Sequence, residues 1–263
     1  MFQLDAYKLK WIAIIGMILN HMVFAWEAIL PFWLMLPLYA AGGLTFPILA
    51  YFVTEGYKHT SNLPRYIMRL FVFGLISVPF HILVFGGGLG LNIMFTIILS
   101  LVFLLMYDKI KIKVLFWLLF VVINAAATLL AFDWFIIGPI VVILYHIIRN
   151  ENTRRIVPPI VAGVLWLSLS LFSIWWLSVA QATPGMEADA EAIMASFGSM
   201  ELMMASTTFI IGCIAAAFLL KGFNGERGKR MKWLFYAFYP VHLAALAGVA
   251  IALGLLDLSI FGL

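Results

Sequence analysis

Asn20 and His21 interrupt an otherwise apolar run, and their side chains could do chemistry. They lie in the stretch KLKWIAIIGMILNHM, residues 8–22, which starts with two lysines in its first three positions and continues as a hydrophobic segment. An imidazole titrates near neutral pH and can act as a general base, while a neighbouring amide can orient it or polarise a carbonyl. An ionisable group within a membrane helix is costly unless it faces a polar cavity or partner. His21 is therefore a candidate catalytic residue, with Asn20 beside it.

Lys10 and His21 have a spacing that places them on one face of a helix. They are eleven residues apart, close to three helical turns, which puts the two side chains about 16 Å apart along the axis. A long anionic cofactor could lie along this face, with a phosphate at Lys10 and its reactive end at His21. The residues alone equally allow a membrane histidine bonded to a neighbouring carbonyl and a lysine that only marks topology.

The composition indicates a helical membrane protein. The chain has 263 residues, of which 65% are hydrophobic and 11% are charged, and its mean hydropathy is +1.10. Long apolar runs are typical of helices that cross a bilayer. We therefore expect a single all-α, polytopic membrane domain over residues 1–263, with no nucleic-acid partner. The first apolar stretch is too long for a signal peptide, so we expect it to be retained as a helix.

The apolar runs predict about nine transmembrane helices. They cover residues 9–28, 32–54, 66–86, 91–107, 114–132, 134–148, 156–180, 201–220 and 232–255. The sixth run is short and also fits a tilted, half or re-entrant helix, so eight or ten crossings stay open.

The distribution of basic residues tests this count, because lysine and arginine concentrate in cytoplasmic connections. All sixteen lie near the start of the first predicted helix or around every second connection, and the alternate connections hold none. This alternation predicts that the N-terminus is cytoplasmic and the C-terminus is outside.

Two of the basic connections carry residues that suit a ligand with phosphate groups. They contribute Glu55, Lys58, Arg65 and Arg69 from residues 54–70, and Asn224, Arg227, Lys229 and Arg230 from residues 221–232. Arginine and lysine bind phosphates, and the two glycines of the second connection let the backbone approach a ligand. The alternative is that these charges mark topology and contact anionic lipids.

The remaining polar residues of the apolar runs are expected to be mainly structural. His242 has a depth in the last helix that would let it approach His21. Asn124 and Asp133 lie toward the outer side, where a lone polar group most often bonds to a neighbouring helix. Cys213 has no partner cysteine, so we expect it to serve packing. The sequence contains no recognisable metal-binding motif, and no metal is expected.

The sequence resembles the TraX family of membrane proteins. The most specific matching stretches are FPILAYFVTEGYKHT (46–60) and NGERGKRMKWLFYAFYPVHL (224–243), and the similarity runs over nearly the whole chain. The Lys10-x10-His21 spacing is also similar to the R/K-x10-H motif of a larger family of membrane acyltransferases. One departure is that Asn20 stands where the family commonly has an aspartate before the histidine.

The resemblance implies a membrane acetyltransferase of the bacterial plasma (inner) membrane. The family is named for an enzyme that acetylates the N-terminus of a conjugative pilin. Acetyl-CoA is thus the implied donor, and a pilin-like protein N-terminus the implied acceptor. A glycan or lipid acceptor stays an alternative, as do a transporter and a non-catalytic assembly subunit.

The implied mechanism gives each candidate residue a role. His21 would act as the base, Asn20 would orient it, and Glu55 would supply the negative charge that Asn20 lacks. The residues implied in holding acetyl-CoA are Lys10, Lys58, Arg65, Arg69, Asn224, Arg227, Lys229, Arg230 and His242. This mechanism requires a passage from the cytoplasmic face to His21.

Overall fold

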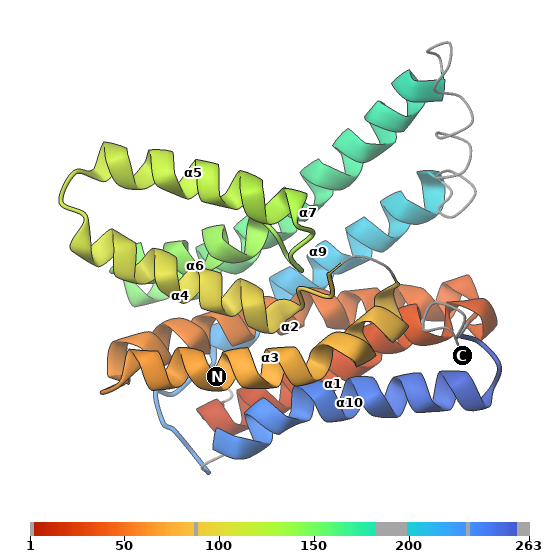
Figure 1. The fold of residues 1–263 in the computed structure, drawn as a ribbon, viewed down its shortest axis with the longest axis horizontal. Coiled ribbons are helices and arrows are strands. Elements are labelled where there is room, and N and C mark those ends of the chain that lie inside the picture. Colours follow the sequence, from red (N-terminus) through yellow and green to blue (C-terminus); the bar gives the residue numbers. More distant parts are fainter. Residues whose placement is uncertain (1–2, 87–88, 182–198, 230–231, 257–263) are drawn as a thin grey trace.

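The computed structural model describes residues 3–86, 89–181, 199–229 and 232–256, and this part of the chain forms a bundle of helices (Figure 1). The helices are α1 (Ala6–Trp26), α2 (Phe32–His59), α3 (Leu63–Phe85), α4 (Ile93–Lys109), α5 (Lys113–Leu129), α6 (Ile137–Ile147), α7 (Glu151–Gln181), α9 (Ser199–Lys221) and α10 (Lys232–Ala252). A short 3-10 helix, Glu27–Ile29, follows α1. The all-α fold class predicted from the sequence is confirmed for the described residues.

All nine predicted helices are present, although not all are long enough to cross a bilayer by themselves. Six candidate membrane spans occur in the described residues, at Ala6–Ile29, Phe32–His59, Leu63–Phe85, Glu151–Val179, Leu202–Lys221 and Trp233–Ala252. The α4 and α5 helices have 17 residues each and α6 has 11, below the roughly 20 that a full crossing needs. The chain is an integral membrane protein, and the side on which each terminus lies stays a prediction.

Side-chain caps explain why several helices begin where they do. The Asp5 carboxylate accepts a hydrogen bond from the Lys8 amide at 2.8 Å at the start of α1. The Asn62 side chain accepts one from the Arg65 amide at 2.9 Å, and Pro64 occupies the first turn of α3. Each cap satisfies a backbone donor that has no partner within its own helix. The capping residues therefore set where α1 and α3 begin, and with this the positions of the basic side chains in their first turns.

The α2 and α9 helices pack with their backbones in close contact. A Cβ atom added to Gly43 would lie 2.0 Å from the carbonyl oxygen of Phe209, and one added to Gly212 would lie 1.8 Å from that of Ala40. Small residues at a helix interface permit this approach inside a membrane protein. The crossing holds α2 in place, and α2 contributes to the walls of both cavities described below.

Cys213 compensates for a proline within α2. Pro47 has no amide hydrogen, so the carbonyl of Gly43, four residues earlier, loses its helical partner. The buried Cys213 thiol donates to this carbonyl, with an S···O distance of 3.2 Å. The packing role expected for Cys213 is confirmed, with a hydrogen bond in addition.

The basic connections gather at one end of the bundle. Figure 1 shows the α2–α3, α4–α5 and α9–α10 connections at the same end, at the left of the view. We call this the basic end; it carries Lys10, Arg65, Lys111 and Arg227. The first and last helices are neighbours in the bundle, because α10 packs against both α1 and α3.

The close α2–α9 crossing predicts that Gly212→Ala lowers the free energy of unfolding by about 1–3 kcal/mol, because the added methyl group would press on backbone rather than on a flexible side chain. Thermal unfolding of the detergent-solubilised protein measures the change. Gly248→Ala is the matched control, since a Cβ atom there meets no atom within 4 Å. Equal melting temperatures for the two variants would contradict the prediction.

Candidate functional site

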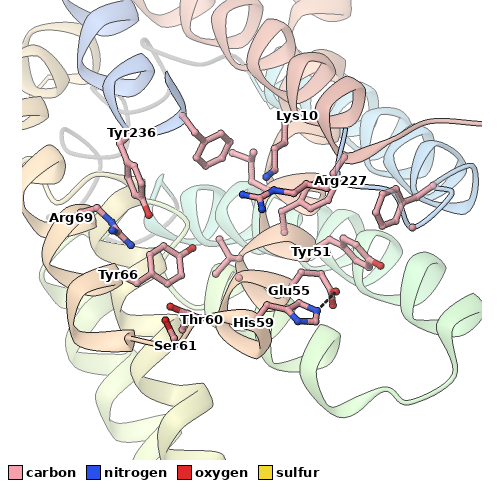
Figure 2. A pocket seen from close by; sticks show the side chains of 18 of the residues that line it. Lys10, Tyr51, Glu55, His59, Thr60, Ser61, Tyr66, Arg69, Arg227 and Tyr236 are labelled. Atoms are coloured by element: carbon pink, nitrogen blue, oxygen red, sulfur yellow. Dashed lines mark ion pairs between the residues drawn. The ribbon is translucent and has the colours of Figure 1, made fainter. Parts of the chain in front are cut away.

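A large cavity lies at the basic end, between α1, α2, α3 and the connection that follows α9 (Figure 2). Its volume is about 840 Å³. Of the residues predicted to take part in the site, those that line it are Lys10, Glu55, Arg65, Arg69, Arg227 and Lys229. The structure therefore brings together charged side chains from three helices and one connection that are far apart in the sequence.

Most of these cations are free to bind an anion. Figure 2 shows Lys10 and Arg227 beside one another, with Arg69 across the cavity near Tyr66 and Tyr236. None of the lysines and arginines named above forms an ion pair within the described residues. The Nε atom of Arg69 is buried and has no hydrogen-bond partner there. Such donors suit phosphate oxygens, which accept charge-assisted hydrogen bonds.

Aromatic rings line the same cavity, and some of them form cation–π contacts with its lysine and arginine side chains. The Lys10 ammonium lies 4.9 Å from the ring centre of Phe52 and 5.7 Å from that of Phe235. The Arg69 guanidinium lies 5.5 Å from the ring centre of Tyr236. These contacts position the charges, and the ring faces offer a flat surface to an organic ligand.

Glu55 lies at this cavity and is committed to an ion-pair network. Its carboxylate pairs with Arg154 of α7, whose side chain is only 2% exposed. Arg154 also donates to Glu151 at 2.7 Å and to the Tyr145 carbonyl at 2.6 Å. A buried guanidinium needs such partners, and losing one is costly. Glu55 thus joins α2 to α7 at the basic end and does not border the pocket around His21.

Three other predicted cofactor-binding residues, Lys58, Asn224 and His242, do not line the large cavity. Lys58 pairs with Glu55 at 3.4 Å, and the Asn224 side chain bonds to Glu226 at 3.0 Å within its own turn. His242 lies deep in the bundle against His21. Arg230 lies outside the described residues.

His21 and His242 form a hydrogen-bonded pair whose geometry fixes the position of the protons. His242 Nδ1 lies 2.9 Å from the carbonyl oxygen of Phe238. A carbonyl only accepts, so Nδ1 of His242 carries a proton and Nε2 of the neutral ring is an acceptor. His21 Nδ1, 2.8 Å away, must then donate to it. Neutral His21 is left with an unprotonated Nε2, the form of imidazole that a general base needs.

A second, small pocket borders the His21 ring. Its volume is about 30 Å³, room for a water molecule. The polar residues that line it are Asn20, His21, Thr45, Asp133 and Tyr239. The hydroxyl of Tyr239 is buried and has no hydrogen-bond partner within the described residues. The pocket therefore offers donors, an acid and a base around one small space.

Asp133 and Tyr239 are the members of this pocket that the sequence reasoning missed. Asp133 was expected to be structural, because it lies toward the outer side as a lone polar group, which most often bonds to a neighbouring helix. The rule that singled out His21, an ionisable group between apolar runs, applies equally to Asp133.

Leu49 of α2 separates the two cavities and lines both of them. The passage that the sequence-based mechanism requires is thus closed at this residue in the structure. The side of the barrier that faces His21 is polar, and the other side is cationic.

Comparison with known proteins decides the family. The profile described as TraX protein matches residues 5–250. The chain belongs to the TraX family. This TraX-family protein is also 27% identical over 259 residues to the probable fimbrial assembly protein FimC, serogroup H1, of Dichelobacter nodosus, covering 92% of this chain and 94% of that protein. No solved structure matches the chain significantly.

The unpaired cations predict that the large cavity of this TraX-family protein binds a polyphosphate ligand. With coenzyme A as probe, Arg69→Gln should raise the Kd about tenfold, the loss of one charge-assisted hydrogen bond. Titration calorimetry of the detergent-solubilised protein measures the Kd for coenzyme A. Lys111→Gln removes a charge from the α4–α5 connection of the same end, outside the cavity, and should leave the Kd unchanged. Equal weakening in both variants would contradict binding in the cavity.

Proposed function

We propose that this TraX-family protein is a membrane acetyltransferase that moves an acetyl group from acetyl-CoA to an acceptor amine or hydroxyl. The observation that carries the proposal is the chain of hydrogen bonds from the Phe238 carbonyl through His242 to His21. It leaves His21 with a free basic nitrogen next to a polar pocket, and one side chain away from a cationic cavity. The family membership agrees with this activity.

The large cavity suits the donor. Coenzyme A carries phosphates and an adenine ring, and the cavity offers unpaired cations beside aromatic faces. Lys10 lines the cavity while His21 borders the pocket, and both belong to α1. Their separation along the helix is about 16 Å, a span that an extended pantetheine arm can cover. In the proposal the phosphates stay at the basic end, and the thioester reaches the pocket past Leu49.

The pocket suits the transfer step. The acceptor nitrogen or oxygen forms a bond to the thioester carbonyl carbon, and the carbon–sulfur bond breaks. The proton leaves the acceptor for Nε2 of His21 and then passes to the departing thiolate, so that coenzyme A leaves as the thiol. Proton transfer by a positioned base typically contributes 10²–10⁴ in rate. The Asn20 amide and the Tyr239 hydroxyl are donors for the oxygen that becomes negative.

The fimbrial relative bears on the acceptor and the location. Its name describes assembly of fimbriae, which favours a pilin-like protein N-terminus over a glycan or lipid hydroxyl. In the proposal the protein lies in the bacterial inner membrane. Its basic end faces the cytoplasm, as the positive-inside rule requires and where acetyl-CoA is available.

A non-catalytic role in fimbrial assembly is the second candidate. It is favoured by the closed barrier at Leu49 and by the assembly role in the relative's name. On this account the cationic cavity could still bind coenzyme A, but no acetyl group would be transferred.

The proposal predicts that His21→Ala lowers acetyl transfer by about 10²–10⁴-fold, because the base is lost while the cationic cavity is left intact. Purified protein in nanodiscs is incubated with labelled acetyl-CoA and a pilin-type peptide, a glycan and a lipid in turn, and incorporated label is counted. His146→Gln is the control, because His146 pairs with Asp108 at 2.8 Å and borders neither cavity.

Undiminished transfer by a folded His21→Ala protein that still binds coenzyme A would end the proposal. Binding of coenzyme A by the wild type, without transfer to any of the three acceptors, would favour the assembly role.

A further inference from the structure

Asp133 is the one acid among the residues that border the His21 pocket. It comes from the connection between α5 and α6, whereas His21, Asn20 and Tyr239 come from α1 and α10. Its carboxylate forms no ion pair within the described residues. It interacts electrostatically with the Tyr239 hydroxyl, which itself lacks a hydrogen-bond partner there. No described cation pairs with this carboxylate, and its removal from water raises the pKa of Asp133 to about 6, so the acid is mainly ionised at neutral pH.

The backbone around Asp133 is held in a strained conformation. Ala131 and Trp134, with φ of 54° and 56°, are the only residues other than glycine with positive φ in the described part of the chain, and they flank Asp133. Such conformations cost about 1–3 kcal/mol each and persist only where the surroundings impose them. Ala131 lies where α5 ends and Trp134 directly follows the half-buried Asp133, so these two residues set the course of the connection that carries the acid.

Backbone contacts impose this conformation. The Asp133 amide donates to the Leu91 carbonyl at 2.8 Å, and the Thr96 hydroxyl donates to the Asp133 carbonyl. The Trp134 ring stacks on Phe46, with the ring centres 4.2 Å apart. These bonds use the amide and carbonyl of Asp133, and its carboxylate accepts from the Trp134 amide, a bond that the oxygen of a side-chain amide can also accept. An amide in place of the carboxylate would therefore keep the loop in place.

The base at the other side of the pocket needs a negative charge that its nearest partners do not provide. When His21 accepts a proton it becomes an imidazolium, and burial in a medium of low polarity penalises that charge. His242 holds His21 in orientation but is neutral, and Asn20 is an uncharged amide. His81 of α3 also faces His21, and a histidine supplies no negative charge. A nearby carboxylate stabilises a protonated imidazole.

We infer that Asp133 is a positioning residue that stabilises the protonated form of His21 across the small pocket, directly or through one bound water. The inference rests on the proposed function. The proton stays on His21 and is returned to the thiolate, so Asp133 remains ionised throughout. Glu55, which is paired with Arg154 at the large cavity, does not serve this purpose.

The test removes the carboxylate and then restores it from the opposite wall. Asp133→Asn deletes the charge, and the double variant Asn20→Asp with Asp133→Asn returns one carboxylate to the same pocket. Two readouts are used: the pH profile of kcat/KM for acetyl transfer, and the pH at which the His21 ring becomes protonated. The second comes from ¹⁵N-histidine NMR, with the His21 signal assigned by its loss in His21→Ala, and it needs no activity.

Asp133→Asn should lower kcat/KM about 10- to 100-fold, because a carboxylate close to a titrating group shifts the pKa of that group by about one to three units. Because the protonated ring loses its counter-charge, the acid limb of the profile and the NMR midpoint should both move to lower pH. The double variant should move both back. Asp108→Asn, which removes a carboxylate at the basic end, should leave the NMR midpoint unchanged.

An unchanged NMR midpoint in Asp133→Asn would overturn the inference, as would equal midpoints in the single and double variants. Neither result touches the proposed function, because that fails only if the wild type transfers no acetyl group or His21→Ala still does.

Discussion

The hydrogen bond between His21 and His242 is the interaction on which the rest of the site depends. It joins the first helix to the last at 2.8 Å, and the Phe238 carbonyl fixes which nitrogen of each ring carries a proton. In water such a bond would be one of many exchangeable contacts. Within a bundle of apolar helices an unpaired ring nitrogen is expensive, so the pair sets both the orientation of the rings and the packing of α1 on α10. The same bond that stabilises the bundle leaves one basic nitrogen facing a small pocket.

The fold places the candidate binding cavity and the candidate reaction pocket at different depths along α1 and α2. Lys10 and His21 stand on α1 at different depths, and α2 provides the shared wall between a cationic cavity and a small polar pocket. That wall is held by the contact of α2 with α9 at Gly43 and Gly212, where backbone meets backbone. With α2 held in this way, Leu49 is the side chain of that helix that borders both cavities. A reactive thioester would thereby be kept from water until its anionic end is bound.

The sequence predicted the helices and the cationic face well, because both follow from local physical rules. Apolar runs and the spacing of basic residues placed all nine helices within five residues of the observed ends. The helical period predicted one face of α1 for Lys10 and His21, and in the structure Lys10 lines the large cavity and His21 the small pocket. Asp133 and Tyr239 were missed because their importance arises only when the α5–α6 connection folds against α1 and α10. The pairing of Glu55 with Arg154 was equally invisible, since it joins residues 99 positions apart. No periodic pattern reports contacts of that kind.

The most direct measurement of the central claim is a cryo-EM structure of the protein bound to a non-hydrolysable acetyl-CoA analogue. The account predicts phosphates among Lys10, Arg69 and Arg227, a displaced Leu49 side chain, and the acyl carbonyl in the small pocket. With the acyl group in that position, an acceptor group hydrogen-bonded to His21 Nε2 would lie about 3.5 Å or less from the carbonyl carbon. An analogue whose acyl end points away from His21, with Leu49 still closing the pocket, would contradict the account.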